Sequence, residues 1–206
     1  MRLFKVLGTT RQPFHGGAGQ WPYPGWLEVE GDLEPCLNGL HLCREGDLAE
    51  WLGPEIWEAE HEGELIEHGD KVVVRRARLL KRLNWDDRVA RLFACDCAER
   101  VLGDGADPRS TDAVRVARLF ANGDTTADEL TAARAAAGAA ARAAARAAAG
   151  AAARAAAGAA AWDAAGAAAR AAARAASWDA SWAAAGAAER EWQAGRLAWY
   201  LDGEGE

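Results

Sequence analysis

The stretch from Thr131 to Ala188 constrains the fold most strongly, because it is nearly all alanine and is interrupted at a fixed interval. From Arg134 to Arg190, every fourth residue is an arginine, a glycine or a tryptophan. Alanine has the highest helix propensity, and each glycine inside a helix costs only about 1 kcal/mol relative to it. The tract therefore predicts a continuous helix over about residues 126–160, with further helix beyond and interruptions near residues 158–166 and 177–181, where Asp and Ser can cap new segments.

The four-residue interval also predicts how this helix packs. Each repeat advances about 400° around a helix of about 3.6 residues per turn, so the marked positions drift by about 40° per repeat. They follow a winding ridge and do not form the fixed seam of a coiled coil. The alanine methyl groups beside the ridge let a second helix approach closely, and tryptophans fill the remaining space. We expect packing or self-association through this set: Gly138, Gly150, Gly158, Trp162, Trp178, Trp182, Trp192 and Trp199.

Charge and composition exclude several classes of protein. Residues 1–130 hold 16 Lys and Arg against 24 Asp and Glu, which argues against the basic face that general nucleic-acid binding needs. Arginines recur along the alanine tract, which argues against a membrane span. Four cysteines do not indicate a disulfide framework, and the N-terminus has no apolar run typical of a signal peptide. We therefore expect a cytoplasmic protein that binds neither nucleic acid nor membrane.

Local patterns predict an α+β fold class with two domains. A small α+β domain is expected over residues 1–83, and a mostly α-helical domain of long helices or a helical bundle over residues 84–206, with the alanine-rich tract at 126–190. In the first domain we predict one short helix at 47–52 and strands at 2–7, 26–30, 40–43, 55–63, 64–67 and 71–75.

Capping signals divide the second domain into helices. Asn84 is expected to cap a helix over residues 85–102, and Asp107 with Pro108 to begin a helix that Gly123 ends. The segment from Thr126 to Glu129 matches a capping box. A last helix carries Trp192, Leu197, Trp199 and Tyr200 on one broad side, and we expect it to dock back on the body of the protein.

Cys36, His41 and Cys43 form the densest local signal in the first domain. They could converge around a zinc ion, with His61 or His68 as a fourth ligand. Their spacing matches no standard zinc knuckle, and the alternative is a buried turn with apolar cysteines. The loop before them also leaves two alternatives open. Its aromatic residues, which are His15, Trp21, Tyr23 and Trp26, either line a pocket or clamp the loop onto the core.

The chain from about Trp85 onward resembles a family described as immunity proteins of bacteria and phages. The resemblance is carried by Arg91–Leu102, Asp107–Ser110, the Ala/Trp repeat, Glu189–Gln193 and Leu197–Leu201. It implies an all-helical, non-catalytic binding protein, in principle one that blocks a toxin. The alanine tract is purer and more regular here than a conventional compact domain requires.

The N-terminal part is similar to an uncharacterised phage and bacterial domain that carries the Cys36-to-Cys43 pattern. The sequences of Gly39–Leu42 and Ile56–Glu60 are also similar to the middle of small ADP-ribosyltransferases. That similarity implies an early nicotinamide-clamping residue, for which His15 is available, and a late catalytic acid, for which no clear motif exists.

The function we expect is that of a non-catalytic interaction protein without a cofactor. In it, the alanine-rich helical domain mediates packing or self-association with a protein partner or a second copy, and the first domain presents a binding face. One alternative is a toxin-neutralising immunity-type protein that acts as a compact monomer. The other is an ADP-ribosyltransferase-like first domain. No Walker loop, GxSxG, HExxH or CxxC motif is present in the sequence.

Overall fold

The computed structural model describes residues 1–17, 19–102, 107–139, 142, 146 and 186–204. The chain forms two compact units. One consists of Met1–Phe93 together with Arg190–Glu206, and the other of Ala94–Glu189. The C-terminal segment therefore belongs to the same unit as the N-terminal strands.

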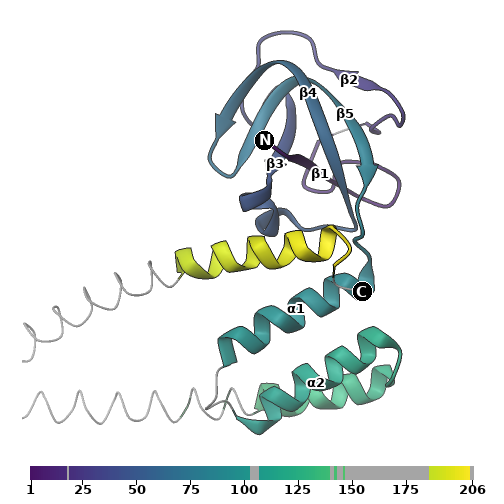
Figure 1. The fold of residues 1–206 in the computed structure, drawn as a ribbon, viewed down its shortest axis with the longest axis vertical. Coiled ribbons are helices and arrows are strands. Elements are labelled where there is room, and N and C mark those ends of the chain that lie inside the picture. Colours follow the sequence, from purple (N-terminus) through teal and green to yellow (C-terminus); the bar gives the residue numbers. More distant parts are fainter. Residues whose placement is uncertain (18, 103–106, 140–141, 143–145, 147–185, 205–206) are drawn as a thin grey trace, which may run out of the picture. The chain divides into compact units, whose positions relative to one another are not determined.

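The first unit is built on five antiparallel strands (Figure 1). Four of them pair in the order β5, β3, β1, β4, and β4 pairs again with β5, so the sheet closes into a small barrel. The fifth strand, β2, pairs with β5 outside this ring. The strands are β1 (Leu3–Leu7), β2 (Trp26–Glu28), β3 (Leu40–Arg44), β4 (Glu55–His68) and β5 (Lys71–Arg82).

Alternating side chains of the four ring strands fill the barrel, because successive residues of a strand point to opposite faces. Trp21, from the long loop after β1, closes over the same core and is 2% exposed. The buried cluster consists of Leu3, Leu7, Trp21, Leu40, Leu42, Trp57, Ala59, Val72, Val74, Ala77 and Leu79. Since Leu3 and Leu7 belong to it, the residue midway between them, Lys5, also starts from the core-facing side of β1.

The strand predictions were right in position and wrong in length. Residues 55–63 and 64–67, predicted as two strands, form the single strand β4. Gly63 has φ +79 and lies where the register with β5 shifts, which indicates a β-bulge. The strand continues past this bulge, although it was predicted to end at Gly63. The predicted helix at 47–52 is a 3-10 helix, η1 (Glu45–Trp51).

The predicted fold class is wrong. Residues 1–83, predicted as an α+β domain, form a β-barrel in which the described helical content is the 3-10 helix η1. The helices that follow are short and not long: α1 (Asp87–Leu102) has 16 residues and α2 (Pro108–Asn122) has 15. Residues 127–139 and 186–201 are also helical. The helices predicted over residues 85–102 and from Asp107 to Gly123 match α1 and α2, whereas most of the helix predicted beyond residue 139 lies outside the described residues.

The helix ends show how these stop signals act. Asp86, and not the predicted Asn84, caps α1, because its Oδ1 accepts the backbone N–H of Val89 at 2.8 Å. Asp107 caps α2, and Gly123 ends it in the left-handed conformation with φ 83, as predicted. The predicted capping box is confirmed. Glu129 accepts the backbone N–H of Thr126 at 2.9 Å, and Thr126 Oγ1 accepts that of Glu129 at 3.3 Å.

Within the second unit, an arginine joins α2 to α1. Arg118 donates to the carboxylates of Asp96 and Glu99. The side chain of Asp96 is 6% exposed, so this carboxylate is almost fully removed from water. The two neighbouring acids raise the pKa of the Arg118 guanidinium. Arg118 of α2 is therefore held to α1 by an ion pair with the nearly buried carboxylate of Asp96.

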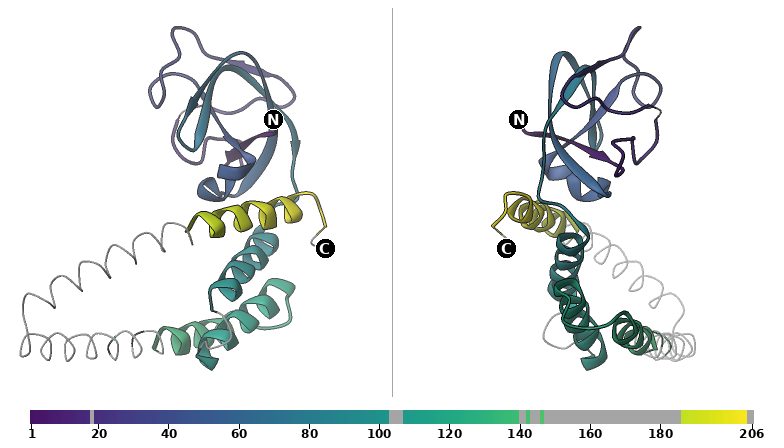
Figure 2. Two further views of the ribbon diagram at one scale, coloured as in Figure 1. Left: turned by 60° about the vertical axis from the view of Figure 1, so that its left-hand side comes forward. Right: turned by 90° about the vertical axis from the view of Figure 1, so that its right-hand side faces the viewer.

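The helix at residues 186–201 enters the first unit from residue 190 onward, and Figure 2 shows it beside the barrel from two further directions. Leu197, Tyr200 and Leu201 are buried. The Tyr200 ring meets the Phe93 ring edge to face at 6.4 Å between centroids, and Asp202 pairs with Arg2 of the barrel at 3.0 Å. The prediction of a helix that docks back on the body is confirmed.

Most of the predicted interaction residues of the alanine tract lie outside the described residues; these are Gly150, Gly158, Trp162, Trp178 and Trp182. Gly138 lies in the helical segment 127–139, and Trp192 and Trp199 are partly buried in the last helix. Within the described part of the chain, no helix has the length and apolar character needed to cross a membrane.

Candidate functional site

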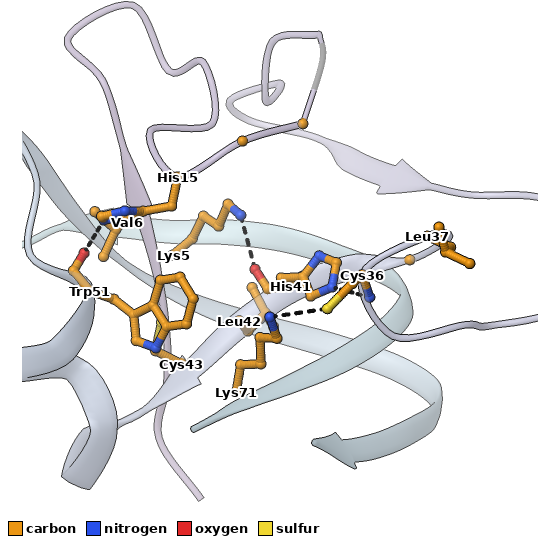
Figure 3. Close-up of a pocket in the computed structure, with 13 residues that line it drawn as sticks. Lys5, Val6, His15, Cys36, Leu37, His41, Leu42, Cys43, Trp51 and Lys71 are labelled. Atoms are coloured by element: carbon orange, nitrogen blue, oxygen red, sulfur yellow. Dashed lines mark hydrogen bonds between the residues drawn. The ribbon is translucent and has the colours of Figure 1, made fainter. Parts of the chain in front are cut away.

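A pocket of about 390 Å³ opens on the barrel where β1 and β3 separate (Figure 3). Leu3 and Phe4 of β1 pair with Arg44 and Cys43 of β3, and the pairing does not continue to the next residue of β1. The opening is completed by the loop after β1, the turn before β3, the end of η1 and the start of β5. The lining residues are Lys5, Val6, His15, Gly16, Gly17, Cys36, Leu37, Gly39, His41, Leu42, Cys43, Trp51 and Lys71.

Lys5 spans the gap between the separating strands. Its Nζ donates to the carbonyl oxygen of His41 at 2.9 Å and lies 5.0 Å from the centroid of the Trp21 ring. Burial lowers the pKa of the Lys5 ammonium to about 8, because the charged form loses water. The carbonyl and the aromatic face are the two groups that stabilise the charge in its place.

Lys71 reaches the pocket from the start of β5. Its Nζ lies 3.4 Å from Sγ of Cys36 and 5.2 Å from the centroid of the Trp51 ring. Cys36 is exposed and has φ 69, a left-handed conformation that is uncommon for a residue with a side chain. In Figure 3, one dashed line joins Nζ of Lys5 to the carbonyl oxygen of His41, and another joins Nζ of Lys71 to Sγ of Cys36.

His41 is held as a neutral imidazole. Its Nε2 accepts the backbone N–H of Cys36 at 3.2 Å, which leaves the ring proton on Nδ1. Burial lowers the pKa of His41, and the charges of Lys71, Lys5 and His68 lower it further. At neutral pH, His41 is therefore a donor through Nδ1 without a charge of its own.

His15 and Trp51 form the opposite wall. Nε2 of His15 lies 2.7 Å from the carbonyl oxygen of Trp51 and 3.2 Å from that of Leu52, so this nitrogen carries the proton and donates. The His15 ring meets the Trp51 ring edge to face at 5.2 Å. The imidazole thus ties the loop after β1 to the end of η1.

The three predicted zinc ligands all line this pocket but do not form a zinc site there. Burial raises the pKa of the Cys43 thiol to about 12. The Nε2 lone pair of His41 is used by Cys36. Among the residues that the structure describes, no three His, Cys, Asp or Glu side chains are grouped so as to hold a metal ion. We therefore derive no metal chemistry from this site.

The aromatic residues of the first loop divide between the two predicted roles. His15 lines the pocket, and Trp21 anchors the loop in the core. Tyr23 packs on Trp57 with 4.9 Å between ring centroids and is 45% exposed. Trp26 lies against the guanidinium groups of Arg76 and Arg78, outside the pocket.

Sequence reasoning missed the two lysines. A signal was available, because the chain has 3 lysines against 21 arginines, and Lys5 interrupts an apolar strand at a core-facing position. What the sequence does not show is that Lys5 and Lys71 meet at one opening, since that depends on closure of the barrel.

A second, more open hollow differs in charge. It is lined by carboxylates of Asp47, Glu50, Asp70 and Glu191, with one arginine, Arg190. Asp47 is already paired with Arg44 at 2.6 Å. Because this hollow is acidic and the first pocket is basic, the two do not share a ligand class.

Comparison of the chain with models of protein families, with curated proteins and with solved structures finds no match. The family resemblances therefore stay predictions.

Proposed function

We propose that this chain is a non-catalytic interaction protein whose barrel receives a group of a protein partner in the pocket of Lys5 and Lys71. The observation that carries the proposal is the pocket itself. Its volume of about 390 Å³ is within the usual range for a ligand site. Its lining includes Leu37, which is 77% exposed.

The state of the lining side chains favours binding over catalysis. Nε2 of His15 lies against the carbonyl oxygen of Trp51, Nε2 of His41 accepts the backbone N–H of Cys36, and the Cys43 thiol stays protonated. Acid–base catalysis needs a group that can exchange a proton near the reacting atom, and Lys5, whose pKa is lowered to about 8, is buried with its Nζ against the carbonyl oxygen of His41. No carboxylate lines the pocket, so the late acid of an ADP-ribosyltransferase has no counterpart among its lining residues.

A peptide selection tests the proposal. Random peptides displayed on phage are selected on the full chain, and binding is compared before and after alkylation of Cys36 with N-ethylmaleimide. Cys36 is the exposed cysteine of the four, and a Cys97→Ser background removes the partly buried one. We expect selected peptides to lose binding when Cys36 is blocked.

The matched control places the same adduct away from the pocket. In a Cys36→Ser background, Leu80→Cys gives an exposed thiol on β5 that is not among the lining residues. Its alkylation is expected to leave peptide binding unchanged. Selected peptides that are indifferent to the Cys36 adduct, or a selection that enriches no sequence, would exclude the pocket as the binding site.

On sequence grounds we also propose that the alanine-rich tract contributes self-association. Its regular glycine and tryptophan positions favour close contacts between helices. Light scattering coupled to size-exclusion chromatography is expected to give a mass above the 21.8 kDa of one chain. A strictly monomeric protein would rule out self-association and leave the immunity-type interpretation, in which a single chain binds its target.

A further inference from the structure

We infer that the pocket binds an oxyanion, a carboxylate or phosphate group of its ligand, through the ammonium groups of Lys5 and Lys71. This inference rests on the proposed function, since it names the group that the partner inserts.

The first argument is the charge of the lining. It contains two lysines and two histidines and no carboxylate, in a chain with a formal net charge of −7. The third lysine of the chain, Lys81, lies outside the pocket and pairs with Glu58 at 3.6 Å. Within the described residues, neither Lys5 nor Lys71 has a carboxylate within ion-pair distance. Although the chain has a net negative charge, no described carboxylate pairs with Lys5 or Lys71.

The second argument is the desolvation of Lys5. An ammonium group has three N–H donors, and the structure assigns one of them to the carbonyl oxygen of His41. A buried charge is costly unless it is paired and hydrogen-bonded. An oxyanion supplies both the opposite charge and the missing acceptors. The site is therefore complementary to an anion and not to a neutral group.

The third argument is the neutral donors around the two charges. Nδ1 of His41 carries the ring proton, because Nε2 accepts from Cys36. Gly16 and Gly17 line the pocket in left-handed conformations, with φ 101 and 99. Since neither has a side chain, a ligand can approach the backbone closely there.

The dimensions indicate that the oxyanion is part of a larger ligand. A volume of about 390 Å³ exceeds what a single carboxylate or phosphate fills. The ammonium groups act as point charges and do not impose the planar fork of arginine, so either group fits. The apolar rim at Leu37 and the Trp51 ring leave contacts for the rest of the ligand.

Calorimetric titration with sodium acetate and with inorganic phosphate, at constant ionic strength in chloride, tests the inference on the full chain. The two anions stand for carboxylate and phosphate, and the one that binds more tightly identifies the group. We expect saturable binding that weakens at least tenfold in Lys5→Met and in Lys71→Met. Lys81→Met, which removes a lysine outside the pocket, is expected to bind as the original protein does.

A pH series adds a readout that misfolding does not mimic. Acetate keeps one charge between pH 7 and pH 9, whereas Lys5 loses its proton with a pKa of about 8. Of the groups that face Lys5, His41 is neutral and Cys43 is a protonated thiol across this range. If the neutral amine does not bind the anion, affinity falls about tenfold from pH 7 to pH 9. This fall should be absent in Lys5→Met.

Two outcomes would overturn the inference. One is the absence of saturable binding of either anion, and the other is equal weakening by all three lysine variants. If pocket-dependent peptides are selected but carry no acidic residue, and neither acetate nor phosphate binds, the proposed function stands and the oxyanion inference fails. If no pocket-dependent peptide is found while acetate or phosphate binds through the two lysines, the reverse holds.

Discussion

At the scale of single residues, Lys5 is the buried ionisable group on which the account of the pocket depends. It starts from the core-facing side of β1, between Leu3 and Leu7, and its amine ends in the gap that β1 and β3 leave between them. A methionine at this position would fill the same space with no charge to desolvate. The cost of the Lys5 charge can therefore be measured as a function of pH.

We expect the stability of the original protein to rise relative to Lys5→Met between pH 7 and pH 9. The folded-state pKa of Lys5 is lowered to about 8 from an ordinary value of 10.5. The unfolded chain thus binds more protons between these values, and stability rises with pH across that window. The expected gain from pH 7 to pH 9 is about 1 kcal/mol, measured by urea denaturation of both proteins.

The comparison stops at pH 9 for a physical reason. Burial raises the pKa of the Cys43 thiol from its ordinary value of 9.0 to about 12, so the folded state holds this proton more tightly. Stability is then lost in both proteins as the pH rises from 9 to 12, and the two losses differ because the Lys5 charge also acts on Cys43. A difference between the two proteins that stays constant from pH 7 to pH 9 would mean that the Lys5 amine is not desolvated.

Gly39 offers a second test at this scale. It has φ +144, and an added Cβ would lie 2.2 Å from Cγ1 of Val73 in the core of the sheet. Gly39→Ala is expected to destabilise the protein by about 2 kcal/mol or more, because both the backbone and the packing must shift. Gly46 is the control, since a Cβ there meets nothing within 4 Å. If both alanine variants unfold at the same urea concentration, the turn before β3 is not packed as described.

At the scale of elements, the helix ends that depend on neighbouring residues could be predicted from the sequence. The cap at Asp107, the stop at Gly123 and the capping box at Thr126 were predictable because each depends on residues within one turn. Asp86 replaced Asn84 as the cap of α1, since either side chain can accept a backbone N–H and the choice depends on where the chain leaves β5.

The contact between α1 and α2 gives a prediction at this scale. Arg118→Ala removes a cation from the nearly buried carboxylate of Asp96, and we expect a loss of stability of about 2 kcal/mol. Arg115→Ala is the matched control. Arg115 pairs with Asp112 along the surface of α2, with both side chains more than half exposed, and its loss should cost less than about 0.5 kcal/mol. Far-ultraviolet circular dichroism during urea denaturation measures both, and equal losses would contradict the assignment.

At the scale of the whole molecule, the prediction failed where contacts join distant parts of the chain. Strand β5 pairs with both β3 and β4, and this closure turns a set of correctly placed strands into a barrel. A pattern of alternating residues shows which face of a strand is buried but not which strands become neighbours. The α+β prediction failed for that reason. The described helices are short, and most of the tract predicted as a long helix lies outside the described residues.

The candidate site was predicted in part for the same reason. Cys36, His41 and Cys43 are close in sequence, so their proximity in space could be foreseen, although the described structure does not group their side chains as ligands of one metal ion. Lys5 and Lys71 lie on different strands, and only the closed barrel brings both to one pocket. The positive charge of the pocket could therefore not be predicted before the pairing of the strands was known.

The most direct test of the account is the titration of Lys5 itself, followed by carbon-13 NMR of protein labelled at the lysine Cε. The chain has 3 lysines, so the spectrum is simple, and Lys5→Met assigns the signal. We expect the Lys5 signal to titrate near pH 8 and to shift to a higher pH when acetate or phosphate is bound, because an anion favours the charged amine. A Lys5 signal that titrates near the ordinary value of 10.5 and does not respond to either anion would contradict the account.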